Sequence, residues 1–206
     1  MSYLCLLASE RAMAVVGDSR LTLAPVPLHW DKAKKIGWSI DSQCLWACCG
    51  LTVFGGVNFA HLTTRIFQGS SSLEEKARLL TKRVNPPLKL QRKLYRKHTT
   101  FSLLAGQWTA TGAELITLDL DGQRGTLRRW SAPAFLEAGW NAKLRPPMPN
   151  PATFRQATSA ELARLGRERV ASVIAADHRL SRENRTNIQT VGGPILWAVL
   201  ERPEKG

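Results

Sequence analysis

Residues 2–20 of the chain read SYLCLLASERAMAVVGDSR, and this stretch decides the fold. It contains two short apolar runs, Tyr3–Ala8 and Ala12–Val16, separated by a polar segment, Ser9-Glu10-Arg11. Two such runs around a short polar segment predict a β-hairpin. The apolar residues are continuous rather than alternating, which is typical of strands that are covered on both faces. A second polar segment, Gly17-Asp18-Ser19-Arg20, directly follows the hairpin.

The rest of the sequence predicts further strands and three helical segments. Strands are expected at Lys35–Ile40, Gln43–Cys49, Phe101–Ala105, Leu115–Leu120, Gly125–Trp130 and Ile195–Leu200. Helices are expected over Val53–Phe67, from a capping box at Ser71–Glu75 to an end or kink at Pro86-Pro87, and from Thr158 to a frayed end at Asp177-His178. This order predicts an α+β fold with two antiparallel sheets stacked between helical layers. We expect one domain over residues 1–206.

The composition is that of a globular protein, with 44% hydrophobic and 22% charged residues among 206. No apolar run approaches the ~18 residues that span a bilayer, and no basic segment precedes Tyr3–Ala8 as it would in a secretory signal. The four cysteines lack CxxC spacing, which favours reduced thiols over disulfides or a zinc site. We therefore expect a cytoplasmic protein with no membrane partner, no metal and no cofactor.

The net charge is +13, from 29 basic and 16 acidic residues. The densest basic segment would form a stripe along one side of a helix, with Leu90 and Leu94 on the other side; the stripe consists of Lys89, Arg92, Lys93, Arg96 and Lys97. We interpret it as the solvated face of an amphipathic helix. Binding of nucleic acid along this stripe is an alternative function.

Ser2 is a candidate nucleophile because its side chain is small enough for Met1 to be removed by methionine aminopeptidase. A terminal serine carries its own general base, since an α-amine with a pKa near 8 can accept the hydroxyl proton. A nearby lysine can lower that pKa and stabilise the alkoxide, while a carboxylate holds the lysine in place.

Four short segments resemble the proteasome β-subunit family, including its bacterial HslV-type and Anbu-type members. Ser2 opens a strand, Gly17-Asp18-Ser19-Arg20-Leu21-Thr22 follows the next, Lys34-Lys35-Ile36 opens a third, and Cys49-Gly50 ends a fourth. A later segment, Val191-Gly192-Gly193-Pro194-Ile195, resembles the glycine-rich turn into a late strand of the same family. This family belongs to the N-terminal-nucleophile hydrolases, so the resemblance implies a four-layer αββα sandwich.

The resemblance also implies hydrolysis of amide bonds in peptide or protein substrates. Ser2 would attack the carbonyl carbon, with Lys35 stabilising the nucleophile and Asp18 orienting Lys35. The backbone N–H of Gly50 would stabilise the oxyanion. Cys48 and Thr22 would line the substrate pocket. The active form would be a ring-shaped, self-compartmentalising homo-oligomer, and an unfoldase could be its partner.

The chain departs from the family pattern in four places. Its nucleophile is serine where threonine is usual, and the Pro25–Asp31 loop needs one extra residue to bring Lys35 into register. Ala138 stands where the family has a supporting serine, and Asn187 stands where it has an aspartate. A catalytically weak or inactive homologue that binds a partner or serves as a structural subunit is therefore a second hypothesis.

Overall fold

The structure is a computed structural model that describes residues 2–23, 28–30, 34–50, 53–54, 57–95, 100–139, 145–183 and 191–204. For residues 21–23, 28–30 and 95 it describes the backbone alone. Two antiparallel sheets form its centre. One has the strand order β12-β1-β2-β13 and the other the order β11-β10-β9-β6-β5. The strands of the first sheet are β1 (Tyr3–Ala8), β2 (Ala12–Asp18), β12 (Ala134–Gly139) and β13 (Ile195–Glu201). Those of the second are β5 (Ile36–Ser39), β6 (Cys44–Gly50), β9 (Phe101–Thr109), β10 (Gly112–Leu120) and β11 (Gly125–Ser131).

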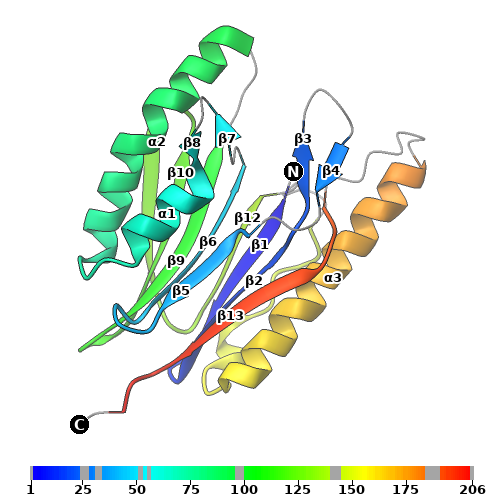
Figure 1. Cartoon of the computed structure of the whole chain (residues 1–206). Helices are drawn as coiled ribbons and strands as arrows, with labels where there is room; N and C mark the ends of the chain where they lie inside the picture. Colours follow the sequence, from blue (N-terminus) through cyan, green and yellow to red (C-terminus); the bar gives the residue numbers. More distant parts are fainter. Residues whose placement is uncertain are drawn as a thin grey trace.

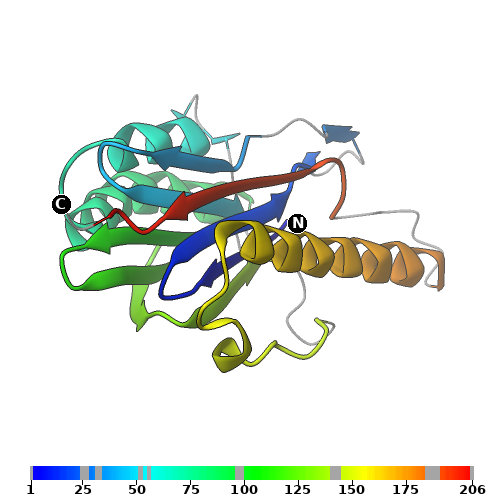
Figure 2. The same cartoon turned by 90° about the horizontal axis from the view of Figure 1, so that it is seen from below.

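The two sheets stack face to face, and helices cover both outer faces (Figures 1 and 2). Helices α1 (Phe59–Phe67) and α2 (Leu73–Tyr95) lie on the five-stranded sheet, whereas α3 (Ser159–Glu183) lies on the four-stranded sheet. One apolar cluster fills the space between the sheets, and one fills the space under each helical layer. The predicted four-layer αββα sandwich is confirmed.

The hairpin at the start of the chain explains this layering. Every residue of β1 and β2 is buried, as the continuous apolar runs predicted. Successive side chains of a strand point to opposite faces. In β1, Leu4 and Leu6 therefore join the cluster between the sheets, while Cys5 and Leu7 join the cluster beneath α3.

Helix α1 is shorter than predicted. It begins at Phe59, where the side chain of Asn58 accepts a hydrogen bond from the backbone N–H of His61 and caps the helix. The preceding residues form a small hairpin, β7 (Val53–Phe54) and β8 (Val57–Asn58), so a helix from Val53 was wrong. Another small hairpin joins β3 (Leu21–Leu23) to β4 (Leu28–Trp30).

Helix α2 begins as predicted and continues past the two prolines, where the sequence predicted either an end or a kink. Ser72 and Glu75 form the capping box, each side chain accepting from the other residue's backbone N–H. The helix then continues through Pro86 and Pro87 to Tyr95, so an end at the prolines was wrong. The prolines cannot donate to the carbonyls four residues earlier, which belong to Lys82 and Arg83; both residues are exposed, so water can bind these oxygens.

The last turns of α2 carry the described part of the basic stripe, Lys89, Arg92 and Lys93, while Arg96 and Lys97 lie outside the described residues. Leu90 and Leu94 are 51% and 61% exposed, so they do not form a buried side opposite the stripe. Nucleic-acid binding by this stripe remains a prediction.

One lysine of α2, Lys76, is buried. Lys76 has no exposed surface, its Nζ lies 5.9 Å from the centroid of the Phe67 ring, and its ammonium has no hydrogen-bond partner among the described residues. Burial lowers the pKa of Lys76. None of the helices described here is both long enough and apolar enough to cross a bilayer.

Strand β12 and the last turns of helix α3 were not predicted. Strand β12 pairs with β1 over its whole length and forms one edge of the sheet. Helix α3 continues past Asp177, which is 6% exposed and accepts a hydrogen bond from the backbone N–H of Val191 at 3.1 Å. A frayed helix end at Asp177-His178 was therefore wrong, because this carboxylate holds the segment that leads into β13.

Candidate active site

Three of the sequence-predicted site residues meet at one end of the sheets. Ser2 precedes β1, Asp18 ends β2, and Lys35 directly precedes β5. The antiparallel pairing of β1 with β2 sets Leu4 opposite Gly17, which brings the end of β2 beside the start of β1. Lys35 Nζ lies 2.7 Å from Ser2 Oγ and 3.2 Å from Asp18 Oδ2. The structure thus brings together Ser2, Asp18 and Lys35, which are far apart in the sequence.

Asp18 is held on several sides. Its Oδ1 accepts from the backbone N–H of Tyr3 at 2.7 Å, and its Oδ2 accepts from those of Arg20 at 3.1 Å and Gly192 at 3.4 Å. Its side chain has no exposed surface. Burial raises the pKa of Asp18, while the Lys35 ammonium and the backbone N–H donors lower it. These contacts fix the carboxylate in one orientation beneath Lys35.

Lys35 is 2% exposed and donates to Ser2 Oγ, to Asp18 Oδ2 and to the backbone carbonyl of Arg20. Burial lowers the pKa of Lys35, and the adjacent Asp18 carboxylate partly offsets this effect. Because the ammonium donates to Ser2 Oγ, the hydroxyl proton of Ser2 must point elsewhere. The arrangement therefore stabilises negative charge on Oγ and leaves its proton available to a base.

A cavity of about 370 Å³ opens beside Ser2, and its wall includes Gly50, Gly139 and Cys49. Gly50 has a φ of +95°, and a side chain there would overlap the carbonyl oxygen of Thr100. Only glycine is accommodated at this position without strain. Gly50 thus borders the same cavity as the nucleophile candidate, although its role in an oxyanion hole remains a prediction.

The structure describes the side chain of one predicted pocket residue, Cys48, and only the backbone of the other, Thr22. Cys48 is 1% exposed and packs in the cluster beneath α1 and α2, whereas its neighbour Cys49 points the other way and lines the cavity beside Ser2. Cys48 therefore offers a substrate almost no open surface, and its role in lining the pocket stays an untested prediction. Thr22 lies in β3, where its backbone pairs with that of His29, and its side chain lies outside the described part of the structure.

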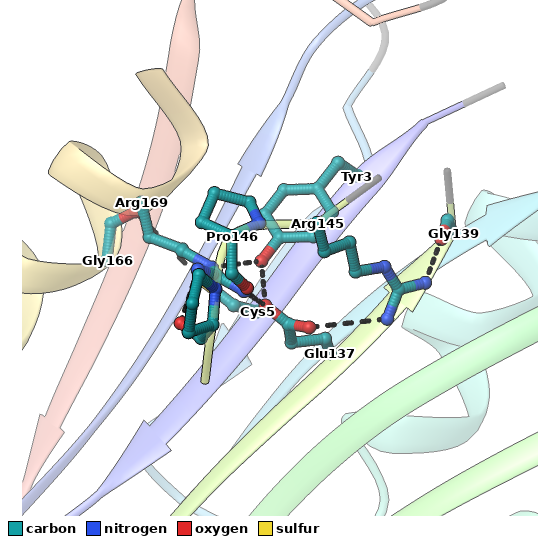
Figure 3. Close-up of polar contacts among 9 residues, drawn as sticks. Tyr3, Cys5, Glu137, Gly139, Arg145, Pro146, Gly166 and Arg169 are labelled. Carbon is teal, nitrogen blue, oxygen red and sulfur yellow. Dashed lines mark hydrogen bonds and ion pairs between the residues drawn. The ribbon is translucent and has the colours of Figure 1, made fainter. Parts of the chain in front are cut away.

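A polar cluster that was not predicted includes two residues of the cavity wall, Glu137 and Arg145 (Figure 3). Its centre is Glu137 of β12, which is nearly buried. Glu137 Oε1 accepts from the Tyr3 hydroxyl and from Arg169 Nε at 2.8 Å, and Oε2 accepts from Arg145 Nη1 at 3.3 Å. Arg145 also donates to the carbonyl oxygen of Gly139. The cluster thus links the start of β1, the end of β12 and helix α3.

Several predicted features lie outside the described residues: Met1, Asn187, and residues 25–27 and 31 of the Pro25–Asp31 loop. Ala138 is described: it pairs with Leu4, is 8% exposed, and packs in the cluster between the sheets. An alanine there supplies no hydroxyl to Ser2, as its sequence position had indicated.

The fold is shared with solved structures of proteasome-like proteins. Eukaryotic HslV from Trypanosoma brucei aligns with 97% of this chain and 99% of its own, at a TM-score of 0.54 and 17% sequence identity. A Gly-1 mutant of Anbu from Hyphomicrobium sp. strain MC1 aligns with 98% of this chain and 82% of its own, also at a TM-score of 0.54 and 17% identity.

These alignments cover nearly the whole chain, so it has the fold of the proteasome β-subunit-like N-terminal-nucleophile hydrolases, as the sequence resemblance implied. At this level of identity the likeness defines the fold alone. No family model and no curated protein matches the sequence.

Proposed function

We propose that the protein hydrolyses amide bonds in peptides or proteins, with Ser2 as its nucleophile once the bond between Met1 and Ser2 has been cleaved. The observation that carries this proposal is the 2.7 Å contact between Lys35 Nζ and Ser2 Oγ, with Asp18 Oδ2 3.2 Å behind the ammonium. Ser2, Lys35 and Asp18 are almost completely buried, yet Ser2 also borders a cavity. A buried lysine held against a hydroxyl at a cavity wall fits an activated nucleophile.

In the proposed reaction, the uncharged α-amine of Ser2 takes the proton from Oγ as Oγ attacks the substrate carbonyl carbon. The new C–O bond leaves negative charge on the carbonyl oxygen, which the Gly50 N–H would stabilise by about 3 kcal/mol. The C–N bond then breaks, and the α-ammonium gives its proton to the leaving amine.

An ester on Ser2 remains. Water attacks this ester and gives a proton to the α-amine, the C–O bond to Oγ breaks, and Oγ recovers its proton. Throughout these steps Lys35 keeps its proton, favours the uncharged form of the amine, and stabilises the charge that develops on Oγ. Asp18 would hold Lys35 in this position.

The proposal extends to a ring-shaped homo-oligomer that encloses the sites, with an unfoldase as a possible partner. The shared fold with HslV and Anbu supports it as an analogy. A cytoplasmic location is part of the same proposal, since all four cysteines are free and buried.

The test is labelling with a peptide epoxyketone, which forms a ring only with a terminal amine and its neighbouring hydroxyl. We expect intact mass spectrometry to show loss of Met1, and peptide mapping to place the adduct on Ser2. The Ser2→Ala variant should not react, and Lys35→Met should react at least ~100-fold more slowly. Retention of Met1, or absence of an adduct on Ser2 in the wild type, would refute the proposed function.

A further inference from the structure

The charged residues around the cavity beside Ser2 are not equally available to a substrate. Three of them, Asp119, Glu137 and Arg145, line its wall. Glu137 and Arg145 are paired with each other, and their side chains are only 4% and 16% exposed. Both oxygens of Glu137 already accept hydrogen bonds, and the Arg145 guanidinium also binds the Gly139 carbonyl oxygen. The charges of Glu137 and Arg145 are therefore already paired within the protein, and they are less available to bind a substrate.

Asp119 reaches the cavity from the five-stranded sheet. In the ladder, Cys49 lies opposite Ser102, and Ser102 lies opposite Asp119, so the three side chains share one face of the sheet. Cys49 belongs to the cluster between the sheets, which identifies that face as the one toward β12 and Ser2. Two strand spacings of ~4.8 Å place the Asp119 backbone about 10 Å from that of Cys49.

The carboxylate of Asp119 lacks a charged partner in the described part of the chain. There it accepts a hydrogen bond from Ser102 Oγ at 2.6 Å, and no ion pair involves it. Asp119 is exposed. A carboxylate at this position is a local exception in a protein whose net charge is +13. The wall of the cavity thus carries one negative charge, on Asp119, that no basic side chain among the described residues neutralises.

We propose that Asp119 is a specificity-determining residue that selects substrates with a lysine or arginine side chain close to the bond that is cut. This inference rests on the proposed function of Ser2. With the substrate carbonyl at Ser2, a long cationic side chain near the scissile bond can span the cavity and place its charge against the Asp119 carboxylate. Ser102 holds the carboxylate in place by donating to one of its oxygens.

The experiment compares two peptide epoxyketones that differ in one residue, which is either arginine or norleucine, next to the reactive ketone. The measured quantity is the rate constant for labelling of Ser2. In the wild type we expect the arginine probe to react about fivefold faster than the norleucine probe, as expected for one partly exposed ion pair. Asp119→Asn keeps the hydrogen bond with Ser102 and removes the charge, so the ratio of the two rates should fall to about one.

Glu114→Gln is the matched control, because it removes one negative charge from the opposite face of the same strand, β10. It should keep the wild-type preference. Equal rates for the two probes in the wild type, or an arginine preference that survives in Asp119→Asn, would overturn the inference and leave the proposed function intact. Failure of both probes to label Ser2 in the wild type would overturn the proposed function and this inference together.

Discussion

Gly139 and Ser2 meet backbone against backbone: a side chain on Gly139 would overlap the carbonyl oxygen of Ser2. Gly139 also has a φ of +82°, and the same side chain would lie 3.2 Å from Cys49 Sγ. The position therefore sets how closely the end of β12 approaches the nucleophile candidate.

The first prediction concerns this contact. Gly139→Ala should destabilise the protein by at least about 2 kcal/mol, because it adds a steric clash to the cost of a left-handed backbone. Gly112→Ala is the control, since Gly112 also has a positive φ, +136°, but has nothing within 4 Å of the added atom. Urea unfolding of both variants measures the difference; equal losses of stability would show that the contact with Ser2 contributes nothing.

The second prediction concerns the buried pair of Asp18 and Lys35. Asp18→Asn should lower the free energy of unfolding by about 3–5 kcal/mol, because it leaves the Lys35 ammonium buried without a carboxylate. Combining it with Lys35→Met removes that unpaired charge, so the double variant should be more stable than the sum of the single losses indicates. A double-mutant cycle from urea unfolding measures this coupling. Strictly additive losses would contradict a stabilising interaction between the two groups.

The third prediction is a dependence of stability on alkaline pH. Burial lowers the pKa of Lys35 below its ordinary 10.5, so in the window between the two values the unfolded chain binds more protons than the folded one. Stability contributed by this site must then rise as the pH rises through that window. The free energy of unfolding of the wild type minus that of Lys35→Met should therefore increase toward pH 10.5. Groups whose surroundings the substitution leaves unchanged cancel in this difference, and a flat or falling difference would contradict the lowered pKa.

The fourth prediction concerns the thiols. Burial raises the pKa of Cys48 and of Cys49 to about 12, so both should remain protonated and unreactive in the folded protein. Iodoacetamide at mildly alkaline pH should modify none of the four cysteines before unfolding and all four in concentrated guanidinium, as counted by intact mass. Cys49 is the informative residue because it lines the cavity beside Ser2. Its rapid alkylation in the folded protein would show that the cavity activates a thiol.

The parts of the fold that could be predicted from the sequence are those in which local pattern and tertiary position agree. The strands β1 and β2 are buried on both faces, and their continuous apolar runs indicated it. Ser2, Asp18 and Lys35 could be placed together only through the resemblance to the proteasome β-subunit family, because strand ends by themselves do not show which residues meet. Strand β12 was missed because Glu137 and Gly139 interrupt its apolar pattern, and these residues are explained only by Arg145, Arg169 and Ser2.

The missed parts of the site depend on contacts between residues far apart in the chain. The Tyr3 hydroxyl meets Glu137 across 134 positions, and no local spacing reveals such a pair. Asp119 alternates with apolar residues of β10 as any solvated strand residue would, and only the cavity beside Ser2 sets it apart. Helix α2 can continue through Pro86-Pro87 because the preceding turn is exposed to water. The sequence pattern does not show whether that turn is exposed.

The ammonium of Lys76 has no exposed surface and no hydrogen-bond partner among the described residues. It marks a weakly stabilised contact between α2 and the five-stranded sheet. Burying an ammonium without a hydrogen-bond partner costs free energy, so we expect local opening of the structure to begin where α2 packs on the five-stranded sheet. Such breathing would begin on the face of that sheet that points away from Ser2. The nucleophile candidate could therefore stay in register while the outer helical layer loosens and closes again.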